Sequence, residues 1–437
     1  MAWLVLGVRP RFRYNRCMRP QSILPLGALL AMTLACSTVS VPGLGPTPTP
    51  TLPPAPPTTS PIDLQSQTLD AVDQAVREAY VREDLDGVAW ESLVTETRAQ
   101  LAAGLDPEGF SIAMGELAGA FPNNAVQFVS RAERIELEAN ASASTTYQGI
   151  GVYFGVRGAP EPRVVVLSVI PGSPAEAAGL KAHDALLAID GEPVPADSTR
   201  DSLANRIRGE AGSVVTLSVR SPGQPPRDVV ITRGEITGTS TMLTDVLPGN
   251  VFYARFPVSM AEDSLQTFGQ AYSTAVAAAP LRGVVLDLRL SSAGSGWPLA
   301  ELLTIFSTGN IGEVYTRQDT QTITLEGQDI SGTQTIPLMV LVGPDTHQEP
   351  ELFAQFLQAN GRAQVFGLPT PGDTEGFVTL ALPDGSRLSI AAQSYRDSAG
   401  VDISATGLTP ANLIDQDWDA YLDDADPVLN AAVQAIP

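Results

Sequence analysis

The stretch that most constrains the fold of this 437-residue chain is residues 337–373, PLMVLVGPDTHQEPELFAQFLQANGRAQVFGLPTPGD. Its apolar run at 338–342 lies between a proline and a Gly-Pro turn, which is typical of a buried parallel strand. Apolar residues then recur at helical spacing between Pro350, which suits a first turn, and Gly361, which suits the residue after a last turn. Residues 364–366 return as a second strand. The segment therefore predicts a strand–helix–strand unit whose two exposed turns would carry a site.

Those two turns read THQEPE at 346–351 and TPGDTEGF at 370–377. They resemble the corresponding turns of the carboxyl-terminal-processing (tail-specific) serine peptidases. In that family the first turn reads S-A-S-A-S-E, with the middle serine as nucleophile, and the second reads T-F-G-K-G-x-V-Q, with the lysine as base. On this pattern the nucleophile position holds Gln348, the base position holds Asp373, and the position of an orienting glutamine holds Phe377. The resemblance implies the family's fold without its Ser–Lys chemistry.

The scarcity of amines and imidazoles supports this interpretation. The chain contains one lysine, Lys181, far upstream of the two turns, and two histidines, His183 and His347. A Ser–Lys dyad needs a desolvated amine within reach of the hydroxyl, and arginine cannot replace it because a guanidinium keeps its proton. We therefore expect no catalytic residues. The alternative is an active serine-type endopeptidase with a rebuilt site, in which His347 serves a hydroxyl such as Thr346 or Ser394.

A third family segment lies upstream. Residues 283–289, GVVLDLR, resemble the family's G-x-V-L-D-L-R, which normally continues as N-x-P-G-G. In the family that glycine turn helps to form the oxyanion hole, whose backbone N–H groups point at a developing charge. Here the turn contains Ala293 and Gly294, with alanine in place of one glycine. We expect residues 236–437 to form a tail-specific-peptidase-like α/β domain.

Residues 147–235 resemble the PDZ domain found inside these peptidases, a small β-sandwich or barrel with two helices. The resemblance rests on YQGIGV at 147–152 and PGSPAEAAGLKAHDALLAIDGEPV at 171–194. A Gly-apolar-Gly-apolar turn that opens a strand offers backbone N–H groups to a terminal carboxylate, so we expect peptide or protein C-termini as partners. A tight turn without a ligand is the alternative. The expected peptide-binding residues are Gly149, Ile150, Gly151 and Val152, with Leu203 and Ile207 at i and i+4 on a following helix.

The N-terminal part predicts export. Residues 1–36 join an arginine-rich start to an apolar run and end at Cys36, which resembles a bacterial lipoprotein signal with Cys36 as the lipidated residue. A plain secretory signal is the alternative, and translation could start at Met1 or Met18. Residues 37–61 form a Pro/Thr-rich linker, and 62–145 read as a helical region. We expect a lipoprotein anchored in the membrane of a bacterial cell envelope and facing away from the cytoplasm, or else a secreted protein.

The composition of the chain limits the classes of partner, metal and cofactor that we expect it to bind. The formal net charge of −22 disfavours binding to phosphate backbones, so no nucleic acid is expected. Both cysteines lie in the leader, so the folded part has neither disulfides nor thiolate metal sites. The sequence contains no carboxylate or histidine pattern with metal-ligand spacing and no phosphate-cradling loop, so we expect no metal and no cofactor. The oligomeric state is not predicted.

Overall fold

The computed structural model describes residues 60–135, 146–157, 163–195, 198, 200–237, 242–258, 260–261, 263–292, 297–416, 418–421 and 426–437. They belong to one compact unit, residues 59–437. The predicted signal peptide with Cys36, and all but the last two residues of the predicted linker, lie outside the described residues. So do Ala293 and Gly294. No helix within the described ranges is both long enough and apolar enough to cross a bilayer.

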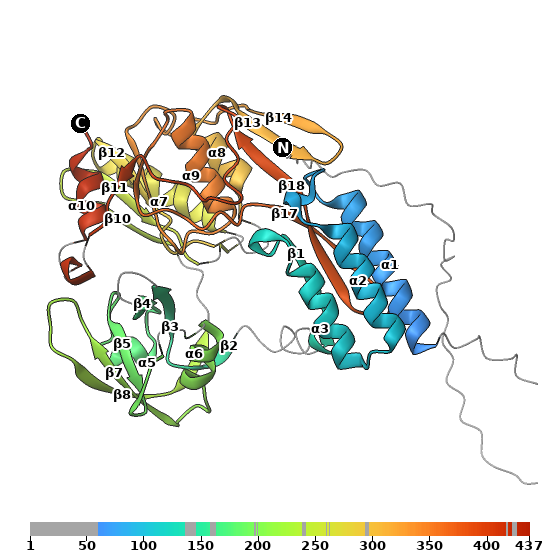
Figure 1. Cartoon of the computed structure of the whole chain (residues 1–437). Helices are drawn as coiled ribbons and strands as arrows, with labels where there is room; N and C mark the ends of the chain where they lie inside the picture. The colour runs from blue at the N-terminus through green and yellow to red at the C-terminus, as the bar shows by residue number, and fades with distance from the viewer. Residues whose placement is uncertain are drawn as a thin grey trace, which may run out of the picture. The chain divides into compact units, whose positions relative to one another are not determined.

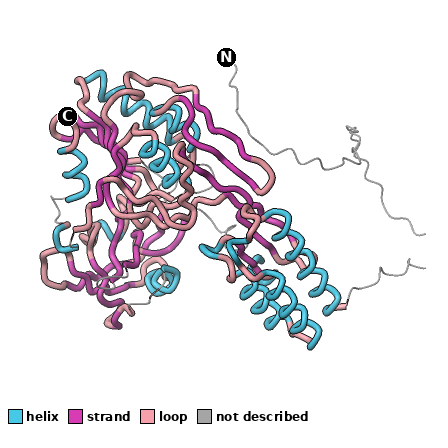
Figure 2. Tube along the Cα trace, turned by 45° about the horizontal axis from the view of Figure 1, so that its top comes forward, coloured by secondary structure: helices cyan, strands magenta, loops and turns pink. Residues whose placement is uncertain are grey.

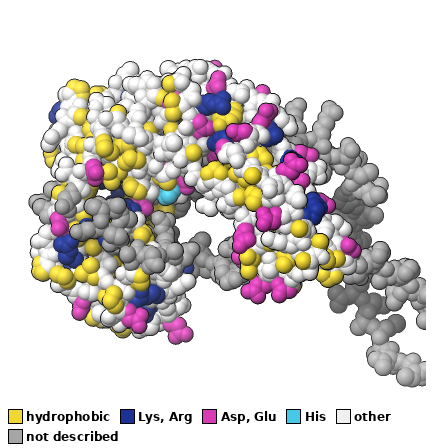
Figure 3. Space-filling view, in the orientation of Figure 1, with side chains coloured by type: hydrophobic (Ala, Val, Ile, Leu, Met, Phe, Trp, Pro, Cys, Tyr) yellow, Lys and Arg dark blue, Asp and Glu magenta, His cyan; other side chains and the backbone are white. Residues whose placement is uncertain are grey.

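The N-terminal part is helical, as predicted. It comprises α1 (Pro61–Ala79), α2 (Trp90–Ala103) and α3 (Pro107–Ala118). The side chain of Ser60 caps α1 and that of Asp106 caps α3. Both of these helices have a proline in the first turn. The helices pack around Tyr80, Trp90 and Phe121, and the ring of Phe121 contacts the rings of the other two. Figure 1 shows them against the long strand β18 (Arg387–Asp397), and acidic side chains gather over them on the face in Figure 3.

The PDZ part is a sheet with two short helices, α5 (Pro174–Ala177) and α6 (Arg200–Ile207). The strand order is β3-β4-β5-β7-β8, with the short β6 on β5. The strands are β3 (Val152–Arg157), β4 (Arg163–Val169), β5 (Ala185–Ile189), β6 (Glu192–Pro193), β7 (Val214–Arg220) and β8 (Arg227–Thr232). A separate ribbon pairs β2 (Thr146–Gly149) with β9 (Gly234–Thr237) and joins the two ends of this part. The predicted class, a small β-fold with two helices, is confirmed.

The α/β part is built on a six-stranded sheet in the order β10-β11-β12-β15-β16-β19, parallel except for β10. The strands are β10 (Leu243–Leu247), β11 (Val251–Arg255), β12 (Gly283–Asp287), β15 (Leu338–Val342), β16 (Gln364–Gly367) and β19 (Asn412–Leu413). Every residue of β12 and β15 is buried, because helices cover both faces of the sheet (Figure 2). One face carries α7 (Ser264–Ala278), α8 (Leu299–Phe306) and α9 (Glu349–Ala359), and the other carries α10 (Pro427–Gln434). The predicted strand–helix–strand unit is β15-α9-β16.

A second, antiparallel sheet joins the helical and α/β parts. It contains β1 (Val126–Val129), β13 (Gly309–Thr316), β14 (Thr320–Leu325), β17 (Gly376–Ala381) and β18. β1 follows the N-terminal helices and pairs with β18, so the region that reads as helical also contributes a strand to a distant sheet. This sheet holds the start of β17, and therefore the second predicted turn, against the N-terminal helices.

Candidate functional site

The site lies at the carboxyl ends of three neighbouring parallel strands, β12, β15 and β16. Loops that leave such ends meet at one edge of the sheet, which is where α/β folds bind ligands. Here the loop after β12 brings Ser292 beside His347 in an isolated parallel bridge. The His347 N–H also donates to the Ser291 carbonyl at 2.9 Å. The sheet therefore brings the two predicted turns and the predicted oxyanion segment to one place.

Gln348 occupies a strained turn between β15 and α9. Its φ of 61° and ψ of −125° are unusual for a residue with a side chain. Two acceptors hold its N–H, Glu351 Oε1 at 3.0 Å and Asp373 Oδ1 at 3.2 Å. A sharp strand-to-helix turn of this kind presents the nucleophile in other hydrolases. At this position the chain has an amide, which is a poor nucleophile.

The buried Glu351 and the partly exposed Asp373 form a carboxyl pair with His347 at its edge. Asp373 Oδ2 lies 3.0 Å from His347 Nδ1, and Glu351 Oε2 accepts the Gly372 N–H at 2.8 Å. Burial, and then the neighbouring Asp373, raise the pKa of Glu351 to about 8. Burial would also raise the pKa of Asp373, but its hydrogen bonds with His347 and Glu351 outweigh burial and lower that pKa to about 2. At neutral pH the pair therefore carries one proton, on Glu351, and one negative charge, on Asp373.

The hydroxyls proposed for a rebuilt site are both engaged elsewhere. Thr346 is fully buried, donates to the Leu288 carbonyl at 2.9 Å and accepts the Gly343 N–H at 3.0 Å. Ser394 is fully buried on β18 and donates to Asp402 at 2.9 Å. Each therefore has a structural role, and neither forms a hydrogen bond with His347 in the structure as described.

The remaining predicted positions of this site offer no chemistry of their own. Phe377 lies on β17 with 40% of its surface exposed and brings no polar group to the position of the orienting glutamine.

Sequence reasoning missed Glu351. The signal for it was present, since the family pattern S-A-S-A-S-E has glutamate at that position. No group of three or more His, Cys, Asp or Glu side chains among the described residues has the geometry of a metal site.

The predicted peptide groove coincides with a cavity of about 320 Å³. Its lining includes Gly149, Ile150, Gly151, Val152 and Ile207, together with Ala204, Arg208, Ser292 and His347. Leu203 instead packs in the hydrophobic core beside Ile150, with 1% of its surface exposed, and Ala204 takes the expected place on the wall. The cavity therefore joins the predicted carboxylate-binding turn, Gly149–Gly151 (the carboxylate loop), to the turn that carries His347.

Gly151 explains why the loop needs glycine. Its φ is +84°, and a Cβ built there would lie 2.3 Å from the Ser173 Cβ. A side chain would therefore be strained in the backbone and would also clash. This requirement alone is compatible with a turn that has no ligand, so the case for binding depends on the cavity and on the groups that line it.

Comparisons with known proteins agree with this architecture. A model of peptidase family S41 matches residues 253–413, which include both turns, and a PDZ model matches residues 165–221. The chain is 31% identical to the carboxyl-terminal-processing protease of Picosynechococcus sp. over 64% of this chain and 67% of that protein. It is 27% identical to the chloroplastic C-terminal processing peptidase of Tetradesmus obliquus over 77% of this chain and 74% of that protein. The solved structure of a photosystem II D1 C-terminal processing protease matches with a TM-score of 0.58 and 25% identity, over 82% of this chain and 94% of that one.

Proposed function

This chain belongs to the carboxyl-terminal-processing peptidases of family S41, and from that premise we propose that it binds peptide or protein C-termini without cleaving them through a Ser–Lys dyad. The single observation that carries the proposal is the pair at the dyad positions, the amide of Gln348 and the ionised carboxylate of Asp373. A Ser–Lys mechanism needs a hydroxyl to attack and an amine to accept its proton, and neither residue supplies one. The chain's one lysine, Lys181, lies in the PDZ part.

The cavity supports the binding half of the proposal. It is concave, and most of its wall is apolar, with a few polar groups, as ligand sites are. The carboxylate loop at Gly149–Gly151 lines it, and β3 borders it with a strand that an extended peptide could follow. A protein that has lost the dyad but keeps such a groove would act as a scaffold, or as an adaptor for an active protease.

The proposed location follows from the leader. We propose residues 1–36 as the signal, Cys36 as the lipid attachment site and 37–61 as a spacer, followed by a helical region at 62–145, the PDZ domain at 147–235 and the peptidase-like domain at 236–437. The protein would then be anchored on the extracytoplasmic side of a bacterial membrane. Fractionation of cells that express the natural chain and Cys36→Ala tests this, since only the natural chain should remain with the membranes. Equal distribution of both would favour a secreted protein.

The decisive test of function is cleavage of an unfolded, fluorescently labelled casein by the full chain. The matched variant carries Gln348→Ser and Asp373→Lys, which restores both dyad residues on the preserved turns. We expect no cleavage by the natural chain, because loss of the nucleophile and base lowers the rate by orders of magnitude. Activity in the double variant would show that the scaffold is intact. Cleavage by the natural chain would contradict the proposal.

One observation favours the second candidate, an endopeptidase with a rebuilt site. Asp373 holds His347 as a carboxylate holds the imidazole of a Ser-His-Asp triad, with Nδ1 engaged and Nε2 left for another group. Ser292 could supply the hydroxyl for this role, because its backbone is bridged to that of His347 and it lines the same cavity. If the natural chain does cleave casein, His347→Ala and Ser292→Ala should each abolish the activity, and retention in either variant would exclude this site.

A further inference from the structure

A short turn of the α/β part contacts the PDZ part through two aromatic side chains. The turn consists of the short helix η3 (Trp418–Ala420) and Tyr421, and it lies between β19 and α10. The indole N–H of Trp418 donates to the His183 carbonyl at 3.0 Å. The Tyr421 ring stacks on the His183 ring, with the ring centres 4.8 Å apart and the ring planes at 28°. A single PDZ residue therefore receives both aromatic side chains.

Two PDZ arginines hold the other side chains of this turn. The guanidinium carbon of Arg163, on β4, lies 4.8 Å from the centre of the Trp418 ring, and that of Arg220, on β7, lies 4.5 Å from it. The next residue, Asp419, forms an ion pair with Arg220 at 3.3 Å and accepts the Gly223 N–H at 3.2 Å. Contacts of this kind are individually weak at a partly exposed site, but here they all depend on one turn and act together.

The backbone of His183 indicates that its side chain has a role. Its φ is +71°, in the left-handed region that favours glycine. The conformation is fixed from the PDZ side, because the His183 N–H donates to the Val166 carbonyl at 2.7 Å. An imidazole at such a position is costly for the backbone, and the stacking on Tyr421 is a gain that glycine would not supply.

Several titratable and charged groups surround the His183 ring. From the strands and the helix packed against it, they are Tyr421, Arg157, Asp287, Arg289 and Asp426. Both arginines already have carboxylate partners, since Arg157 bonds to Asp345 and Arg289 lies 2.6 Å from Asp287. Burial, and then Arg289, lower the pKa of His183. The ring is therefore neutral at pH 7 while it lies among these groups.

We propose that the turn 418–421 is a latch that docks the PDZ part onto the α/β part through His183, and that acidification releases it. The cavity of about 320 Å³ has walls from both parts, with Tyr153 and Ile207 on the PDZ side and Ser292 and His347 on the other. A latch that fixes the two parts therefore also fixes the width of this cavity. The inference goes beyond the proposed function, because it does not depend on which ligand enters.

The direction of the pH effect follows from where the imidazole tolerates a proton. Release of the latch would return the His183 ring to water and its pKa to the ordinary value of about 6.5. The latched state binds this proton less tightly than the released state. Latching is therefore most favourable above that ordinary pKa and weakens as pH falls through it. Protonation would also place a third cation beside Arg157 and Arg289.

The test measures hydrogen exchange in the full chain by mass spectrometry, with rates corrected for the pH dependence of chemical exchange. Residues 180–184 and 220–224 report the latch, and residues 338–342 show that each variant remains folded. Trp418→Ala removes the indole, and Arg220→Gln breaks the same contacts from the PDZ side in case Trp418→Ala does not fold. His183→Asn tolerates a positive φ and removes the titrating ring. The matched control is Leu413→Ala, on β19, whose side chain is 55% exposed.

At pH 7.5 we expect Trp418→Ala to raise exchange in both PDZ segments at least about fivefold, because two cation–π contacts and a hydrogen bond are lost. Arg220→Gln should raise it less, and Leu413→Ala should change it by less than about twofold. Unchanged exchange in both latch variants would overturn the proposal.

The same measurement at pH 5.5 tests the release. In the natural chain, exchange in the two PDZ segments should be faster at pH 5.5 than at pH 7.5, and in His183→Asn this difference should be absent. A natural chain whose corrected exchange is the same at both pH values would overturn release by acid. An equal increase in His183→Asn would also overturn it, because another group would then be responsible.

Discussion

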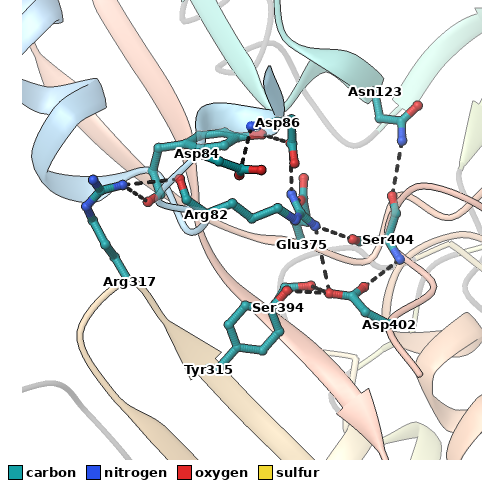
Figure 4. Close-up of polar contacts among 11 residues, drawn as sticks. Arg82, Asp84, Asp86, Asn123, Tyr315, Arg317, Glu375, Ser394, Asp402 and Ser404 are labelled. Atoms are coloured by element: carbon teal, nitrogen blue, oxygen red, sulfur yellow. Dashed lines mark hydrogen bonds and ion pairs between the residues drawn. The ribbon is translucent and has the colours of Figure 1, made fainter. Parts of the chain in front are cut away.

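Arg82 joins the N-terminal helices to the loop that carries Asp373, and its replacement tests whether this contact holds the site together. Its guanidinium bonds to Glu375 at 2.6 Å, to Asp86 at 3.2 Å and to the Ser404 hydroxyl at 2.5 Å, and it lies 3.8 Å from Asp402 (Figure 4). The Glu375 side chain is only 6% exposed. Burial raises the pKa of Glu375 and the contact with Arg82 opposes that rise. Arg82 therefore compensates a carboxylate that is otherwise costly to bury.

The change we would make is Arg82→Met, which keeps the stem and removes the charge. Breaking a buried ion pair from one side costs about 3–5 kcal/mol because the remaining charge is unpaired. Since Arg82 keeps 22% of its side-chain exposure, we expect about 3 kcal/mol, near the lower end of that range. A matched surface control is Arg98→Met, whose ion pair with Asp70 is about half exposed and should contribute less than about 1 kcal/mol.

The pH dependence gives this prediction a second readout. Loss of Arg82 should raise the pKa of Glu375 further, because burial then acts unopposed. A carboxyl with a raised folded pKa is least costly when it is protonated, so the destabilisation should be largest at pH 8 and shrink as pH falls through that pKa.

The assays are urea unfolding at pH 8 and pH 5, and hydrogen exchange at residues 370–376. The double variant Arg82→Met, Glu375→Gln should recover part of the loss, since it removes the unpaired charge. Equal stability of Arg82→Met and the natural chain, or a loss that does not depend on pH, would refute the reasoning.

Two further predictions concern the carboxylate loop and the carboxyl pair. Gly151→Ala should destabilise the PDZ part by about 2 kcal/mol or more and abolish peptide binding, because φ there is +84° and the new Cβ would meet Ser173. Thermal melting measures the loss of stability, and the fluorescence anisotropy of a labelled C-terminal peptide measures the loss of binding. An unchanged melting temperature would contradict the prediction. The natural chain should lose stability as pH rises from about 5 to about 8, because the folded state keeps the Glu351 proton that the unfolded state releases, with the pKa of Glu351 raised to about 8. In Glu351→Gln this loss should be smaller, because the contribution of Glu351 is removed while other carboxyls with a raised pKa, such as Glu375, remain. Urea midpoints should therefore shift in favour of the variant as pH rises, and parallel pH profiles of the two proteins would contradict the role of Glu351.

The sequence predicts the elements around the site well because each has a strong local signal. The run at 338–342 is apolar throughout and becomes β15, and the helical spacing after Pro350 becomes α9. Leu203 shows the limit of such reasoning. Its i, i+4 spacing with Ile207 places both on one side of α6, and both pack in the PDZ core, but spacing does not decide that Ile207 also lines the cavity while Leu203 does not. β1 is missed for a related reason, since its pairing with β18 is set by tertiary contact over more than two hundred residues.

The relation between His347, Glu351 and Asp373 could not be predicted, because it depends on the order of strands in the sheet. The turns that carry these residues become neighbours only because β15 and β16 pair in parallel. That pairing places an aspartate where the family pattern has lysine, 3.0 Å from a histidine and beside a glutamate that keeps its proton. Alignment to the pattern describes these changes as losses of single residues. In three dimensions they compensate one another, since Asp373 bonds both to the imidazole of His347 and to the strained Gln348 N–H. A site in which the replaced residues satisfy each other's hydrogen bonds is one that the fold can keep without the original chemistry.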